Sequence, residues 1–228
     1  MATEFVSFPL REGQTPHDPA SRTATIIKET FDTIAQQPGF QRLYWGTETE
    51  NPNILRIAID WDSVDHHINF TKTEKYKLFI ENFGQIVDIS KGVLYHAHLS
   101  PHPPTRAISQ PTTPATETLV AFFPSSYSKA DQDKFEEDFK NILSALETHG
   151  ADISTSTASG WVVEELPIPN SESNETGKAF VALIGWISVQ AHLDFRNTQA
   201  FKDNIHWLRG AKDLKGVKMV HIASTLVE

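Results

Sequence analysis

An internal repeat constrains the fold of this chain more than any other feature of its sequence. The stretch from Ile59 to Ile80 recurs 125 positions later, from Ile184 to Ile205. Self-similarity at so long a period indicates two copies of one supersecondary unit. Nine positions of the first stretch carry the same residue in the second: Ile59, Trp61, Ser63, Val64, His67, Phe70, Thr73, Lys77 and Ile80.

The repeated stretch is predicted to form a strand followed by a helix. Apolar residues alternate with other residues from Leu55 to Trp61, which is the period of a strand. Ser63 then suits a helix cap, because its hydroxyl can accept a bond from an unpaired backbone N–H. Thr71 and Glu74 have the spacing of a capping box, and apolar residues follow at helical spacing. We expect one buried helix face there.

The elements of the first copy follow the order βαββαβ. A helix is expected around Ile26 to Ile34, ended by Pro38 and Gly39, and a second from Thr71 to Asp88. The four expected strands are residues 5–10, 40–48, 55–61 and 93–99.

A proline-rich segment separates the copies. Residues 101–118 contain five prolines with several Thr and Ser, a composition typical of a semi-extended linker. The second copy is expected to have strands at 119–123, 160–167, 180–187 and 217–224, and helices at 131–149, ended by Gly150, and at 198–214. The polar connection 168–178 is expected to be mobile. The predicted domains are therefore 1–100 and 119–228, joined by the linker 101–118.

Composition excludes several classes of protein. The chain has 228 residues, 39% of them hydrophobic, which is enough for one large core or two small ones. It has no cysteine, which excludes disulfides, thiolate metal sites and a cysteine nucleophile. A net charge of −9 argues against nucleic-acid and membrane surfaces. No targeting segment or long apolar run occurs, so a cytoplasmic location is expected.

Two βαββαβ units predict two four-stranded antiparallel sheets, each with helices on one face. The strands are apolar on both faces, so neither sheet is suited to leave a face in water. The predicted fold is therefore α+β, with two ferredoxin-like repeats whose sheets pack face to face as a fused α+β barrel. Because one chain supplies both sheets, we expect a monomer to be stable, with a homodimer as the alternative.

The repeated motif resembles the dimeric α+β barrel superfamily. The similarity lies in a strand followed by Trp61, Ser63, His67 and Phe70, and again by Trp186, Ser188, His192 and Phe195. The superfamily includes antibiotic-biosynthesis monooxygenase-like and stress-responsive barrel proteins. The resemblance implies a tandem fused barrel. The known activities of the superfamily include cofactor-free oxygenation, polyketide cyclisation and haem chemistry, so the fold alone does not determine a function.

Ionisable side chains are predicted to gather on one sheet face of the first copy. If residues alternate along the strands, one face of that copy is apolar and suits the helices, whereas the other carries the polar groups Arg42, Tyr44, Arg56, Asp60, His96 and His98. The corresponding face of the second copy is mostly apolar and is predicted to contain Val181, Leu183, Ile187, Val220 and Ile222. Such a lumen suits an aromatic or polyketide-like ligand.

The expected catalytic residues are His96, His98, Arg56 and Asp60. Imidazole can act as general acid or base near neutral pH, and Arg42 and Arg56 would hold a carboxylate, enolate or phenolate. Tyr44 would donate a hydrogen bond, and the apolar residues of the second copy would contact the ligand. The alternative is an internal ion pair of Arg56 with Asp60 and packed histidines.

The remaining histidines have less specific interpretations. His96 and His98 have a spacing that could chelate a metal, but no third ligand is fixed by the sequence. Haem would need an axial ligand such as His98 or His206. His67 and His192 repeat at the strand-to-helix corner, which favours a role in packing under Trp61 and Trp186. We expect no tightly bound cofactor and no metal.

The sequence favours a protein that binds, and transforms, a small aromatic or polyketide-type molecule in secondary metabolism. Cofactor-independent oxygenation, cyclisation and lyase chemistry all stay open. The alternative is a non-catalytic small-molecule-binding or stress-associated barrel protein.

Overall fold

The computed structural model describes residues 1–108, 114–149, 156–171 and 175–227. They form two compact units, Met1–Ala97 with Ser224–Glu228, and His98–Ala223. Each unit combines helices with one antiparallel sheet, so the prediction of two ferredoxin-like repeats is confirmed. The face-to-face packing of the two sheets stays a prediction. No helix in the described part of the chain is long and apolar enough to cross a membrane.

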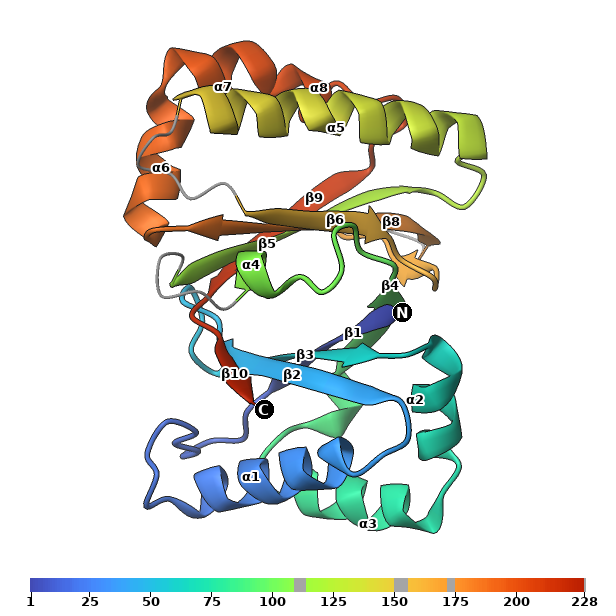
Figure 1. Ribbon diagram of the computed structural model, residues 1–228, viewed down its shortest axis with the longest axis vertical. Coiled ribbons are helices and arrows are strands. Elements are labelled where there is room, and N and C mark those ends of the chain that lie inside the picture. The colour runs from blue at the N-terminus through green and yellow to red at the C-terminus, as the bar shows by residue number, and fades with distance from the viewer. Residues whose placement is uncertain (109–113, 150–155, 172–174, 228) are drawn as a thin grey trace. The chain divides into compact units, whose positions relative to one another are not determined.

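Unit 1 has a five-stranded sheet in the order β10-β2-β3-β1-β4. Figure 1 shows its three helices together on one side of this sheet. The strands are β1 (Ala2–Pro9), β2 (Phe40–Thr47), β3 (Ile54–Trp61), β4 (Val93–Ala97) and β10 (Thr225–Val227). The helices are α1 (Arg22–Ala35), α2 (Val64–Thr71) and α3 (Glu74–Phe83), followed by the 3₁₀ turn η1 (Ile89–Lys91).

The core of unit 1 lies between the sheet and these helices. Alternate residues of β3, Leu55, Ile57 and Ile59, are buried against an apolar stripe of α1. The side chain of Ser21 starts α1 by accepting a hydrogen bond from the backbone N–H of Ala24. The strand period and the helix period therefore direct apolar residues into one layer.

The helical region after β3 consists of two helices, in agreement with the two expected starts at Ser63 and Thr71. Thr73 lies between α2 and α3 and accepts a hydrogen bond from the backbone N–H of Tyr76. A side-chain cap of this kind starts a new helix, so the helix predicted from Thr71 to Asp88 begins at Glu74 instead. α3 then ends at Phe83, before Gly84.

Unit 2 repeats the arrangement. Its main sheet order is β6-β8-β5-β9, and the short β7 also pairs with β8. Figure 1 shows α5, α7 and α8 on one side of this sheet and α4 on the other. The strands are β5 (Ala115–Pro124), β6 (Thr157–Trp161), β7 (Leu166–Pro167), β8 (Thr176–Trp186) and β9 (Gly216–Ile222). The helices are α4 (Thr105–Ile108), α5 (Lys129–His149), α6 (Val189–Asn197), α7 (Gln199–Asn204) and α8 (His206–Arg209).

The predicted linker contains more structure than its composition indicates. The second sheet begins inside it, since β5 starts at Ala115 rather than Leu119. The hydroxyl of Thr116 also donates to the carbonyl oxygens of Ala107 and Ile108, which fixes the short helix α4. Buried Ala107 and Ile108 give this helix the apolar contacts that hold it in place. Gly150 and residues 109–113 and 172–174 lie outside the described residues.

The C-terminal strand β10 belongs to unit 1, although it follows the last strand of the second copy. Thr225 pairs with Trp45 of β2. In unit 2, Ser100, which follows β4 of the first copy, forms a bridge with Ser159 of β6. Ser100 and Thr225 are separated by the same 125 positions as the repeat. The segment that leaves each copy's last strand therefore pairs with the second strand of the other copy.

Candidate functional site

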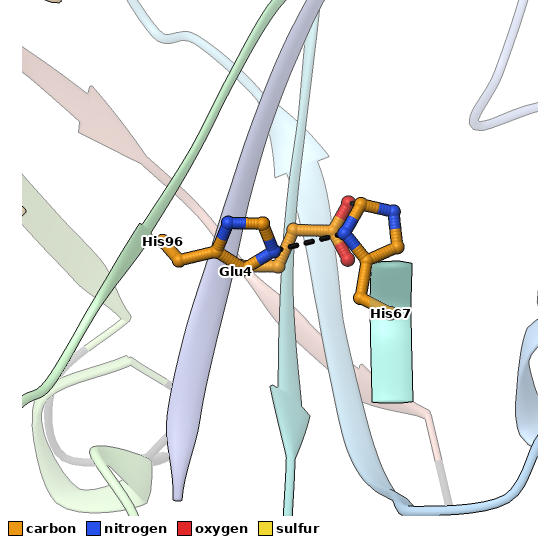
Figure 2. Close-up of side chains that lie close together, drawn as sticks. All are labelled: Glu4, His67 and His96. Atoms are coloured by element: carbon orange, nitrogen blue, oxygen red, sulfur yellow. Dashed lines mark hydrogen bonds and ion pairs between the residues drawn. The ribbon is translucent and has the colours of Figure 1, made fainter. Parts of the chain in front are cut away.

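A buried cluster of one carboxylate, two imidazoles and an indole lies on the helix side of the unit 1 sheet. The indole Nε1–H of Trp61 donates to Oε2 of Glu4 at 2.8 Å. Nδ1 of His67 is hydrogen bonded to Nε2 of His96 at 2.8 Å, and Nε2 of His67 is 3.5 Å from Oε1 of Glu4. Figure 2 shows the carboxylate of Glu4 and the two imidazoles beside one another.

Unit 2 contains the same four residue types in the same arrangement. The indole Nε1–H of Trp186 donates to Oε2 of Glu117 at 2.8 Å. Nδ1 of His192 is 2.7 Å from Nε2 of His221 and 3.4 Å from Oε2 of Glu117. Three of these residues lie 125 positions after Trp61, His67 and His96. The cluster is therefore part of the repeated unit, and we call each copy a Glu–Trp–His–His cluster.

Strand pairing brings the cluster together. Glu4 of β1 lies directly opposite His96 of β4 and Ile59 of β3, so these three side chains share one sheet face. Glu117 lies opposite His221 of β9 and Ile184 of β8 in the same way.

The first imidazole comes from the helix that follows the strand, and it packs on the tryptophan. The His67 ring stacks on Trp61 with centroids 5.9 Å apart, and His192 stacks on Trp186 at 4.6 Å. The expected packing of His67 and His192 under the tryptophans is confirmed. Their hydrogen bonds to a second histidine add a polar role that the sequence does not predict.

A small cavity in unit 1 lies between the sheet and its helices, with a volume of ≈ 40 Å³. Glu4, Trp61, His67, Thr30 and Tyr76 supply its polar groups, and the other lining side chains are apolar. His96 does not line this cavity and lies behind His67. The cluster therefore presents a carboxylate and one imidazole to the cavity.

The corresponding cavity in unit 2 is larger, at ≈ 190 Å³. Glu117, Trp186 and His192 line it as their counterparts line the first cavity. Two arginines, Arg196 and Arg209, also line it. Both cavities thus join an apolar pocket to a few convergent polar groups, which is typical of small-molecule sites.

The charge of the cluster affects a tyrosine beside it. Tyr76 lines the unit 1 cavity, and its pKa is raised, first by burial and second by the nearby carboxylate of Glu4. A negative charge disfavours the tyrosinate form, so the Tyr76 hydroxyl stays protonated and can donate a hydrogen bond to a ligand.

Either cluster could hold a divalent metal ion. One ligand atom from each of Glu4, His67 and His96 lies within 4.8 Å of the other two, and the same is true of the three counterparts in unit 2. Two imidazoles and one carboxylate are a donor set that suits zinc or non-haem iron. In the structure the two imidazoles are hydrogen bonded to each other.

The predicted placement of His96 beside Arg56 and Asp60 is wrong. Asp60 pairs with Thr3, and Arg56 with Ser7, so these two side chains lie on the face away from the helices. His96 pairs with Glu4 and lies on the helix face. On β4 the even-numbered residues face the helices, whereas the prediction placed the odd-numbered residues there. A shift of one residue exchanges the two faces of a strand.

The predicted asymmetry between the copies is also wrong at this position. The face of the second copy that was expected to correspond to His96 contains Val220, but the repeat of 125 positions matches His96 to His221. The structure gives His96 and His221 equivalent partners, because His67 bonds one and His192 bonds the other. Both copies therefore have the polar cluster.

The residues predicted for the opposite face of unit 1 form ion pairs there. Asp60 accepts a hydrogen bond from Thr3 at 2.6 Å and lies 3.7 Å from Arg42. Arg56 pairs with Glu48, with Nε 2.7 Å from Oε1. Tyr44 is buried on this face, opposite Ala58.

Tyr95 also lies on this face, rather than under the helices as its expected register implied. It is opposite Phe5 of β1 and stacks on it. Burial raises its pKa to about 12, and its hydroxyl has no hydrogen-bond partner among the described residues.

The other predicted residues lie apart from the clusters. His98 is exposed beyond the end of β4 and belongs to unit 2, so it does not extend the buried His96 site. His206 is exposed at the start of α8 and packs on Trp207. Ile187 follows β8 and is exposed. The remaining predicted ligand contacts occupy the face of the unit 2 sheet away from its helices: Val181, Leu183, Val220 and Ile222.

Sequence reasoning missed Glu4, Glu117 and His221. The expected first strands began at Phe5 and Leu119, which placed both glutamates outside the sheets. A signal was present, because Glu4 is in phase with the inward row Val6 and Phe8. A carboxylate in such a row is buried when the strand forms, and burial requires a partner.

Comparison with known proteins agrees with this architecture. Residues 15–82 match the family model for antibiotic biosynthesis monooxygenase. No curated protein sequence matches the chain. An anthrone oxidase-like protein of known structure is 15% identical, with a TM-score of 0.61 over 99% of this chain and 92% of its own.

Two further solved structures extend over both units. A proposed monooxygenase from Lactobacillus acidophilus NCFM is 12% identical, with a TM-score of 0.56 over 99% of this chain and 95% of its own. A proposed chlorite dismutase is 14% identical, with a TM-score of 0.56 over 100% of this chain and 94% of its own. At these identities the similarity shows the fold. The chain therefore has the α+β fold of these two-unit proteins, and residues 15–82 within it are similar to the antibiotic biosynthesis monooxygenase family.

Proposed function

We propose that each unit binds a small aromatic or polyketide-type molecule in the cavity beneath its helices and removes a proton from it. The observation that carries this proposal is the duplicated Glu–Trp–His–His cluster, whose carboxylate and first imidazole line a cavity in both units. The match to antibiotic biosynthesis monooxygenases supports an oxygenase-like reaction.

The two residues that line each cavity would act on the ligand directly. In unit 2 these are Glu117 and His192, and either can accept a proton from an acidic C–H or O–H group of a bound ligand. His221 does not line the cavity and is hydrogen bonded to His192 at 2.7 Å. It therefore acts as a positioning residue that orients His192 and can take the proton onward.

Trp186 has a separate role in this scheme. Its indole N–H donates to Glu117, which holds the carboxylate in place and stabilises its charged form. A carboxylate positioned in this way in the lining of an apolar cavity can accept a proton from a bound ligand.

A suitable test reaction is the oxidation of anthrone by molecular oxygen. Removal of a ring C–H proton gives a carbanion that can pass electrons to oxygen, and the balanced reaction converts anthrone and one O₂ into anthraquinone and one water. Oxygen is the only oxidant that this reaction needs. The similarity in fold to an anthrone oxidase-like protein supports this choice of substrate.

The experiment compares His67→Gln, His192→Gln and the double variant with the unmodified chain. Anthraquinone formation is followed by absorbance and oxygen consumption with an electrode. We expect the double variant to lose about 10²- to 10⁴-fold in rate, the usual contribution of a general base. His206→Gln is the matched control, because His206 is exposed and lies outside both cavities. No oxidation by the unmodified chain, or full activity in the double variant, would contradict the proposal.

A non-catalytic small-molecule-binding protein is the second candidate. The observation that favours it is internal pairing, because each imidazole and carboxylate of the clusters already has a partner in the protein. Ligand binding in the cavities without conversion, unaffected by oxygen, would favour this candidate.

The predicted catalytic roles of Arg56 and Asp60, and the predicted ligand contacts of Arg42 and Tyr44, stay predictions for the opposite sheet face. The replacement Arg56→Ala, measured for binding of the same ligand, tests them separately from the clusters. A cytoplasmic location, a monomeric or homodimeric state and a place in secondary metabolism also stay predictions.

A further inference from the structure

We propose that the unit 2 cavity is specific for aromatic molecules that carry a carboxylate, and that Arg196 and Arg209 bind that carboxylate. This inference rests on the proposed function for the position of the site, and it adds the chemical class of the ligand. The unit 1 cavity, in contrast, has no arginine in its lining.

The contrast between the copies identifies the two arginines as a feature of the second site. The repeat of 125 positions matches Arg196 to Thr71 and Arg209 to Gly84. Neither Thr71 nor Gly84 lines the unit 1 cavity. The copies share the polar cluster and differ in the cations beside it, so the difference concerns the ligand rather than proton transfer.

Neither guanidinium of Arg196 and Arg209 has a hydrogen bond or ion pair within the described part of the chain. Asp194, in the same helix as Arg196, accepts a hydrogen bond from Gln190, and Asp203, in the helix before that of Arg209, accepts one from Gln199. A planar guanidinium suits a carboxylate in particular, because it can donate two parallel hydrogen bonds.

The charge of the whole chain makes such local cations necessary for an anionic ligand. The chain has a net charge of −9, so its overall field repels anions. Within unit 2, Glu117 adds a buried carboxylate to the same cavity. Two arginines in the lining offset this repulsion and would hold the anionic end of the ligand.

The volumes of the cavities agree with this division. The unit 2 cavity has a volume of ≈ 190 Å³ and the unit 1 cavity ≈ 40 Å³. Tyr76 lines the smaller cavity, where its match in unit 2 is Phe201. A fused aromatic ring system therefore has more room in unit 2, and we expect a ligand of that size to bind at the unit 2 site only.

The test is isothermal titration calorimetry of the full chain with 1-naphthoate and with 1-naphthamide, which have similar shapes and differ in charge. We expect 1-naphthoate to bind more tightly. Arg196→Gln and Arg209→Gln should each weaken it by about fivefold, the upper range for an exposed ion pair, and leave 1-naphthamide unchanged. The preference should fall at high salt because exposed charges are screened.

Two matched controls locate the effect. Lys202→Gln removes an exposed cation from α7 outside the cavity lining and should leave both affinities unchanged. Met219→Trp should fill the unit 2 cavity and abolish binding of both probes. Leu94→Trp makes the same change at the matched position of unit 1 and should have no effect. Met219 and Leu94 are both partly exposed, which favours folded variants.

Equal affinity for the two probes, no binding of either, or a preference that survives the double arginine replacement would overturn the proposal. These outcomes are distinct from failure of the proposed function. Anthrone is neutral, so its oxidation does not depend on the arginines. A wild-type chain that does not oxidise anthrone would contradict the proposed reaction. The affinities for 1-naphthoate and 1-naphthamide would still test the role of the arginines.

Discussion

Replacing His192 by alanine removes the imidazole that links His221 to Glu117 in the Glu–Trp–His–His cluster of unit 2. The imidazole is buried, stacks on Trp186 at a centroid distance of 4.6 Å and is bonded to His221 at 2.7 Å. Loss of an aromatic contact costs about 0.5–1.5 kcal/mol, and an unpaired buried group costs about 1–3 kcal/mol. We therefore expect a loss of about 2–4 kcal/mol in the free energy of unfolding.

Urea unfolding followed by circular dichroism measures this loss. With a slope of about 2 kcal/mol per molar urea, the unit 2 transition should move down by about 1–2 M. His221→Ala should cost a similar amount. The double variant should cost about 0.5–3 kcal/mol less than the sum of the two, because the second replacement removes a group that has already lost its partner.

His206→Ala serves as the control, since an exposed substitution usually changes stability by less than about 0.5 kcal/mol. Additive losses in the double variant would refute the reasoning, because they would mean that the two imidazoles do not interact in solution.

Three further predictions concern single positions. Tyr95→Phe should raise stability by about 1–3 kcal/mol, because it removes a buried hydroxyl without a described partner. Burial raises the pKa of Tyr95 to about 12, so between pH 10 and 12 this tyrosine ionises in the unfolded chain but not in the folded one. The free energy of unfolding of the wild-type chain should therefore fall over that range. Urea titrations should show a smaller fall for the variant. Glu4→Gln should lower the pKa of Tyr76, since it removes a nearby negative charge, while burial keeps that pKa above 10.0. Ultraviolet titration, with Tyr76→Phe as the reference, measures the change, and an unchanged pKa would contradict the prediction. Gly160→Ala should destabilise unit 2, because the added Cβ would lie 2.0 Å from the backbone carbonyl oxygen of His98. Gly216→Ala is the control, since its Cβ meets nothing within 4 Å. Equal thermal midpoints of the two variants would contradict the predicted clash.

Much of the fold was predictable because the same strand–helix sequence pattern occurs twice, 125 positions apart. The alternation from Leu55 to Trp61 and its copy near Trp186 identify the same strand independently. The second helix start after this strand was predicted at Thr71, from the capping-box spacing to Glu74, but the side chain that caps the helix is that of Thr73. Composition was misleading for α4, because a few buried apolar residues fix a short helix even among prolines.

The site was harder to predict than the fold. His67 and His192 were visible as a repeated pair, but their partners depend on which face of β4 and β9 points to the helices. That choice depends on strand register, which short apolar strands with two buried faces specify weakly in sequence. Only the pairing of Glu4 with His96 in the structure resolves it.

The assignment of β10 to unit 1 has a consequence for biosynthesis. β2 is exposed as a sheet edge until Thr225–Val227 have been made, although the rest of its sheet is complete once β4 is synthesised. At about 5–20 residues per second, the ribosome needs roughly 6–25 s to add the intervening chain. During that interval β2 is an unpaired edge of the kind that recruits foreign strands. A nascent chain stalled before Ser224 should therefore need chaperone protection in its N-terminal half, even though the missing residues are C-terminal.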